Sequence, residues 1–287
     1  MLLRSLTVND IVIQGNRVER CMQTGIAAGS ILGSTEESKG ICILGNDVRH
    51  CYGDGIILFS SHAGLIEGNL SDNNADNDVP KSAFAGIWNV QSTGDLLQYN
   101  ESRNMGESHD GQGFDVDGGC YGTLVQYNYS HNNYGGALLL MQVGNGGVTV
   151  RNNISQNDGR FAINIGCSNQ APYLNFEAYH NIIYTDLSTS VISFMATYDY
   201  VSTNKLGDMT RNIIYATGNA KMTQGNISNY VSFAENVYWG INAYRKDSNP
   251  YTADPQFIAP GTAGDGMLSL SGYALAETSP YLDWGIR

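Results

Sequence analysis

The segment 109–119 holds the residues whose types and spacing best fit acid–base chemistry. Asp115 and Asp117 alternate there with Phe114 and Val116, and successive side chains of a β-strand point to opposite faces. We therefore expect the two apolar side chains in a core and the two aspartates side by side on an exposed face. Because neighbouring carboxylates repel each other, the pKa of one should rise, and that group can then donate a proton.

The spacing of the two aspartates fits cleavage of a glycosidic bond. Two residues of strand rise separate their Cα atoms by about 6.5–7 Å. Carboxyl groups about 6.5–9.5 Å apart cleave with inversion, and those about 5–5.5 Å apart cleave with retention. His109 and Asp110 stand in the turn before the strand and could support the pair. The candidate catalytic residues are therefore Asp115, Asp117, Asp110 and His109.

An asparagine recurs at intervals of 23–31 residues, each time after a short strand pattern such as IVIQGN or TLVQYN. A unit of this size cannot bury its own apolar face, whereas stacked units bury a continuous core. Stacked asparagines can also bond one another as a ladder. The pattern predicts an all-β, single-domain parallel solenoid of about nine coils. The repeated asparagines are Asn16, Asn46, Asn69, Asn100, Asn128, Asn153, Asn181, Asn212 and Asn236.

A second short strand, opened by glycine or alanine, follows in each of the first six coils. Aligning these strands places Trp88 one coil before Asp115 and Asn164 two coils after it, with Leu138 in the coil between. Trp88 would offer a flat apolar face to a sugar ring, and the neighbouring turns supply the only nearby cations. The candidate binding residues are Trp88, Lys81, Arg103, Arg160 and Asn164.

The two ends of the chain differ in pattern. Residues 1–250 are expected to form the β-helix without an N-terminal cap, and residues 251–287 to form a capping segment. Tyr281, Leu282 and Trp284 are apolar side chains suited to covering the end of a solenoid. An uncapped first coil would expose strand edges, so self-association by strand pairing is expected there.

The repeat resembles the right-handed parallel β-helix proteins of the pectate-lyase type, with PbH1-like repeats, over roughly residues 6–240. The string GQGFDVDGG followed by VQYNYSHNNYGG is similar to bacterial secreted β-helix proteins associated with polysaccharide degradation. The resemblance implies a carbohydrate-active protein that is secreted or periplasmic, although no signal peptide is visible in this sequence.

Three functions remain open. A glycoside hydrolase acting on a polysaccharide or oligosaccharide fits the aspartate pair best, although the Gly-His-Gly and Arg-x-Lys motifs of polygalacturonases are absent. A polysaccharide lyase or uronate epimerase is the second, because alginate epimerases carry a GFDPH-like strand with an arginine two coils later. Lys81, His109 or Tyr134 would then be the base. A non-catalytic carbohydrate-binding β-helix is the third, and it would show aromatic residues along many coils without focused acids.

Charge and composition exclude other classes of function. The net charge of −12 disfavours nucleic-acid binding, which needs clustered cations. The sequence contains no run of 18 apolar residues, so no membrane span is predicted. No cofactor and no dedicated metal site are predicted, because the cysteines form no CxxC pair. The acidic turns could nevertheless hold Ca²⁺ through oxygen ligands.

Overall fold

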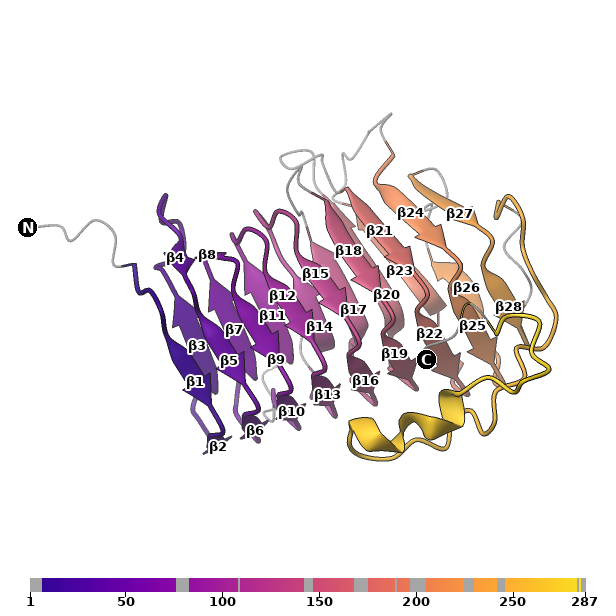
Figure 1. Cartoon of the computed structure of the whole chain (residues 1–287), viewed down its shortest axis with the longest axis horizontal. Coiled ribbons are helices and arrows are strands. Elements are labelled where there is room, and N and C mark those ends of the chain that lie inside the picture. The colour runs from indigo at the N-terminus through magenta and orange to yellow at the C-terminus, as the bar shows by residue number, and fades with distance from the viewer. Residues whose placement is uncertain are drawn as a thin grey trace, which may run out of the picture.

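The protein is a parallel β-helix in the computed structural model. The structure describes residues 7–75, 83–107, 109–141, 147–167, 175–188, 190–196, 205–224, 230–241, 246–282 and 284. Three long parallel sheets run along the solenoid, and successive strands of a coil belong to successive sheets (Figure 1). Within these residues no helix is long and apolar enough to cross a membrane.

The three sheets contain nine, nine and eight strands among the described residues. The number of complete turns is therefore slightly below the nine coils predicted, while the predicted class is confirmed. The first sheet consists of β1 (Val12–Gln14), β5 (Cys42–Leu44), β9 (Leu65–Glu67), β12 (Leu96–Gln98), β15 (Leu124–Gln126), β18 (Val148–Arg151), β21 (Phe176–Tyr179), β24 (Gly207–Thr210) and β27 (Val231–Ala234).

The other sheets follow in chain order within each coil. The second consists of β2 (Arg17–Glu19), β6 (Asp47–Arg49), β10 (Leu70–Asp72), β13 (Glu101–Arg103), β16 (Tyr129–His131), β19 (Ile154–Gln156), β22 (Ile182–Thr185), β25 (Ile213–Ala216) and β28 (Val237–Trp239). The third consists of β3 (Ile26–Gly29), β7 (Ile56–Phe59), β11 (Ile87–Val90), β14 (Gln112–Val116), β17 (Gly136–Met141), β20 (Phe161–Cys167), β23 (Ser190–Ala196) and β26 (Lys221–Gln224). A small pair, β4 (Ser38–Lys39) and β8 (Ser61–His62), lies apart from them.

The predicted asparagine ladder is present and joins the coils at one corner. Each side-chain amide donates from Nδ2 to Oδ1 of the next asparagine over 2.9–3.0 Å, from Asn16 to Asn236. Asn236 then donates to Asp247 over 2.8 Å. The same Oδ1 atoms accept backbone N–H groups, so the ladder satisfies polar groups that the corner would otherwise bury unpaired.

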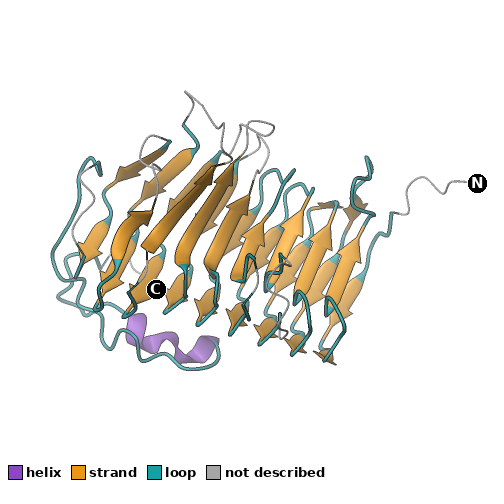
Figure 2. Ribbon diagram, turned by 180° about the vertical axis from the view of Figure 1, so that it is seen from behind, coloured by secondary structure: helices purple, strands orange, loops and turns teal. Residues whose placement is uncertain are grey.

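The C-terminal segment lies along the outer face of the second sheet (Figure 2). It contains the 3₁₀ helix η2 (Met267–Tyr273). The Tyr273 hydroxyl donates to Gln156 of β19 over 2.7 Å, and the Gly266 N–H donates to Glu101 of β13 over 3.0 Å. Tyr281 and Trp284 pack around Tyr251. The segment thus contacts several coils. The domain boundary at residue 250 stays a prediction, and so does self-association through the first coil.

Candidate active site

Strand β14 brings the candidate acids to the third sheet. Phe114 and Val116 enter the core as predicted, with 3% and 0% of their surfaces exposed. Trp88 of β11 pairs with Asp115, which confirms its position one coil earlier. In the next strand the partner is Leu139 rather than Leu138, because Gly136 pairs with Gln112 and shifts the expected alignment by one residue.

Asp115 is buried, which contradicts its expected exposure. Its side chain alternates with those of the core residues, but only 4% of its surface reaches solvent. Burial raises its pKa well above the usual value, and the charges of Asp117, Asp110 and Asp54 raise it further. Its Oδ1 atom has no hydrogen-bond partner among the residues that the structure describes. These surroundings favour the protonated, neutral acid.

Asp110 and Asp117 are the two partly exposed carboxyl groups of the segment. Burial raises the pKa of Asp117, while the Gly118 N–H, which donates to it over 2.6 Å, lowers that pKa. Burial also raises the pKa of Asp110. The charge of His109 lowers that pKa, the charge of Asp117 raises it, and Arg160 lowers it. Asp117 therefore has a contact that stabilises its charged form, whereas Asp110 lies in its negative field.

Asp54 is a fourth member of this acidic group that the sequence argument missed. It precedes β7 and accepts hydrogen bonds from Trp88 Nε1 and the Ala85 N–H, each over 2.9 Å. Burial raises its pKa to about 6. A second aromatic ring, Phe59, packs edge-on against Trp88 with centroids 6.2 Å apart. Asp54 directly precedes Gly55, which opens the second short strand of its coil, and that position was the signal that could have revealed it.

The predicted binding residues separate into those near the acids and those elsewhere. Arg160 reaches back to the acidic turn, where its Nη1 donates to the His109 carbonyl over 3.2 Å. Asn164 pairs with Leu139, which confirms its place two strands beyond Asp115, and it is buried. Lys81 lies outside the described residues.

Arg103 is not beside the aspartates. It belongs to β13 in the second sheet and is 6% exposed. Its guanidinium binds Asp72, Glu101 and Asp265 at 2.9, 2.8 and 3.0 Å. The expected place of Arg103, in the turn beside the aspartate pair, was wrong because Arg103 is a strand residue held by three acids.

The cluster around Arg103 also bears on metal binding. Glu101, His131 and Asp265 could each offer a ligand atom, all within 4.8 Å of one another. The guanidinium of Arg103 already supplies positive charge to two of the three. A cation would be repelled there, so this group does not fit a metal ion. Calcium binding by the acidic turns remains a proposal.

Comparison with known proteins adds to this geometry. No family model matches the chain. Over 251 residues it is 29% identical to the lacto-N-biosidase of Bifidobacterium longum subsp. longum. The aligned region covers 81% of this chain and 15% of that protein. This chain is similar to carbohydrate-active β-helix proteins. It spans about 15% of the length of the curated relative it matches.

One solved structure supports the fold. The tailspike protein of Escherichia coli bacteriophage HK620, in complex with a pentasaccharide, superposes with a TM-score of 0.51 and 10% identity, over 82% of this chain and 42% of that one. The GH136 lacto-N-biosidase from Eubacterium ramulus gives a TM-score of 0.42 and 23% identity, over 75% of this chain and 27% of that one. The tailspike comparison supports the parallel β-helix and nothing finer.

The burial of Asp54 predicts how the stability of the protein depends on pH. A carboxyl group with a raised pKa binds its proton more tightly in the folded state. Its stabilising contribution is therefore complete below about pH 4 and is lost as the pH rises through about 6. The free energy of unfolding contributed by Asp54 should fall by about 2–3 kcal/mol over this range. Urea unfolding should show that the free energy of unfolding falls less between pH 4 and pH 7 for Asp54→Asn than for the wild type.

A matched control distinguishes this effect from a general change in net charge. Glu36 is exposed on the surface, so Glu36→Gln changes the charge by the same amount without emptying a buried site. Its unfolding free energy should change with pH as that of the wild type does. An equal loss of pH dependence in both variants would contradict the assignment to Asp54.

Proposed function

We propose that the protein is a glycoside hydrolase that cleaves an oligosaccharide, with Asp110 and Asp117 as its catalytic carboxyl groups. The observation that carries the proposal is the group of four aspartates in which only these two reach solvent in part. This revises the expected Asp115–Asp117 pair, because a buried acid has no access to a glycosidic oxygen. The 29% identity to a lacto-N-biosidase supports the same reaction class.

The surroundings of the two groups suggest distinct roles. Asp110, whose pKa is raised by burial and by the charge of Asp117, is the proton donor to the leaving oxygen. Asp117, whose charged form accepts the Gly118 N–H, is the nucleophile or the base that activates water. As the glycosidic C–O bond breaks, the leaving oxygen takes the proton of Asp110 and the anomeric carbon receives the oxygen of Asp117 or of water. The Trp88 ring completes the site.

Elimination or epimerisation is less well supported. Each needs a base to remove a proton from carbon, and Tyr134 was one candidate. Its hydroxyl donates to Glu107 over 2.9 Å, and this bond raises its pKa. A raised pKa makes the tyrosinate harder to form, so Tyr134 is poorly suited to act as a base.

A product assay tests the proposal directly. The protein would be incubated with a lacto-N-biosidase substrate and with a panel of other oligosaccharides. New reducing ends without ultraviolet absorbance are expected. Absorbance from an unsaturated product would instead favour the lyase, and tight binding without any product would favour a binding protein. We also propose secretion or periplasmic location, which fits an oligosaccharide substrate and can be tested by fractionating the producing cells.

The pH dependence of the rate provides an independent check. Activity requires Asp117 ionised and Asp110 protonated, so kcat/KM should fall at low pH and again at high pH. Because both pKa values are raised, the acidic limb should lie above the usual carboxyl range. A rate that stays constant from pH 3 to pH 7 would contradict this assignment.

A further inference from the structure

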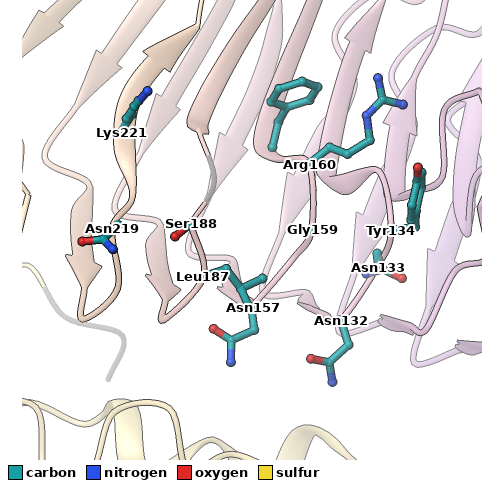
Figure 3. A pocket seen from close by; sticks show the side chains of 11 residues that line it. Asn132, Asn133, Tyr134, Asn157, Gly159, Arg160, Leu187, Ser188, Asn219 and Lys221 are labelled. Carbon is teal, nitrogen blue, oxygen red and sulfur yellow. The ribbon is translucent and has the colours of Figure 1, made fainter.

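A cavity of about 940 Å³ lies further along the solenoid than the acidic group, in the turns between the second and third sheets. This is the size of pocket that holds a ligand in many proteins. Figure 3 shows Lys221 on one side of it and Arg160 and Tyr134 on the other. Asn157, Ser188 and Asn219 add polar groups to its wall.

The cavity continues from the turn that carries Asp110. The Gly135 N–H donates to the Gly111 carbonyl, and the Arg160 N–H donates to the Tyr134 carbonyl. The three turns are therefore stacked, and Arg160 lies two turns beyond Asp110. Further along, Phe161 pairs with Ser190 and Ser190 with Lys221. Phe161, the residue after Arg160, therefore lies two strand spacings, about 10 Å, from Lys221.

The charge of the cavity differs from that of the whole protein. The chain has a net charge of −12, yet both charged side chains on the cavity wall are cations, Arg160 and Lys221. Glu107, the nearest carboxylate to Tyr134, is bound to its hydroxyl. An anion is therefore attracted into this cavity although the protein as a whole repels it. The planar fork of arginine is well suited to a carboxylate.

We propose that this cavity binds a carboxylated sugar unit of the oligosaccharide substrate. The unit would lie two to four coils from the aspartates, with Arg160 and Lys221 attracting its carboxylate from opposite sides of the cavity. The separation keeps a negatively charged unit away from the acids that must cleave the chain. This inference rests on the proposed function for its link to catalysis, but the binding itself does not require turnover.

Calorimetric binding to the Asp117→Asn protein tests the cavity without turnover. The probes are an oligosaccharide ending in galacturonic acid and the same oligosaccharide ending in galactose. We expect the acidic probe to bind about 10-fold more tightly at low salt. In a Lys221→Gln background this preference should fall about 10-fold, and Arg160→Lys should retain more of it than Arg160→Gln.

Lys39→Gln serves as the matched control, because Lys39 is an exposed cation of β4 outside the cavity. It should leave the preference unchanged. Equal binding of the two probes, or an equal loss of preference in Lys39→Gln, would overturn the proposal. Equal affinity for a sulfated probe would overturn the choice of carboxylate. Charge-selective binding by a wild-type protein that cleaves no probe would refute the hydrolase while supporting the cavity, and cleavage without charge selectivity would do the reverse.

Discussion

Replacement of Asp117 by asparagine should lower kcat by about 10²–10⁴-fold while leaving the fold intact. The amide side chain would keep the volume of the carboxylate and still accept the Gly118 N–H, but it can neither attack the anomeric carbon nor activate water. Asp110→Asn should cause a loss of similar size, since it removes the proton donor. Single-turnover assays on the purified variants, with circular dichroism to verify folding, measure both effects.

Asp115→Asn is the internal control for this prediction. Asp115 has 4% of its surface exposed and favours the protonated form, which an asparagine amide resembles in shape and charge. We expect this variant to fold and to lose less than about 10-fold in kcat, within what a neutral substitution near a site can cost. If Asp115→Asn were as inactive as Asp117→Asn, the catalytic pair would be Asp115 and Asp117, and Asp110 would be secondary.

Asn100→Ala should produce a large loss of stability. Asn100 is fully buried, and its Oδ1 accepts both the backbone N–H and the side-chain amide of Asn69. Its own amide donates to the Ile66 carbonyl over 2.9 Å. Alanine would remove the partners of the Asn69 backbone N–H and of the Ile66 carbonyl inside the corner, at a cost of about 1–3 kcal/mol for each. Denaturant unfolding should therefore show a loss of about 3–5 kcal/mol.

The first asparagine of the ladder offers a comparison at the same position of the repeat. Asn16 is exposed, so water can replace the bonds that Asn16→Ala removes. We expect a loss below about 1 kcal/mol for it. Similar losses in the two variants would mean that the ladder contributes through local corner geometry rather than through buried hydrogen bonds.

The fold could be predicted because an asparagine recurs at the position in each coil where stacked corners need a side-chain amide. The asparagines predict the solenoid and the length of its coils, although they slightly overestimate the number of complete turns. The alternation at Phe114 and Val116 predicts which face enters the core. The position of Trp88 next to Asp115 followed from the same alignment. Leu138 was placed wrongly because the spacing between coils changes by one residue at β17, and no residue type marks that change.

The site was less predictable because exposure depends on what covers a face. Alternation correctly turned Asp115 away from the core but could not reveal that the outer face is closed over it. Asp54 was missed because its importance comes from the bond to Trp88, thirty-four residues later. Arg103 looked like a turn cation, whereas contacts with Asp72 and with Asp265 of the C-terminal segment hold it on a different sheet.

The asparagine ladder has a direction, and this direction determines on which side a further asparagine could join it. Every rung donates toward the C-terminal end, where Asp247 receives the last amide. An aspartate side chain has no N–H group, so the array of side-chain amides ends at that residue. At the opposite end, Asn16 Oδ1 accepts no bond from any described residue. The ladder can therefore be continued by a further asparagine amide on the Asn16 side only, because Asn16 Oδ1 can accept a hydrogen bond whereas Asp247 has no amide to donate.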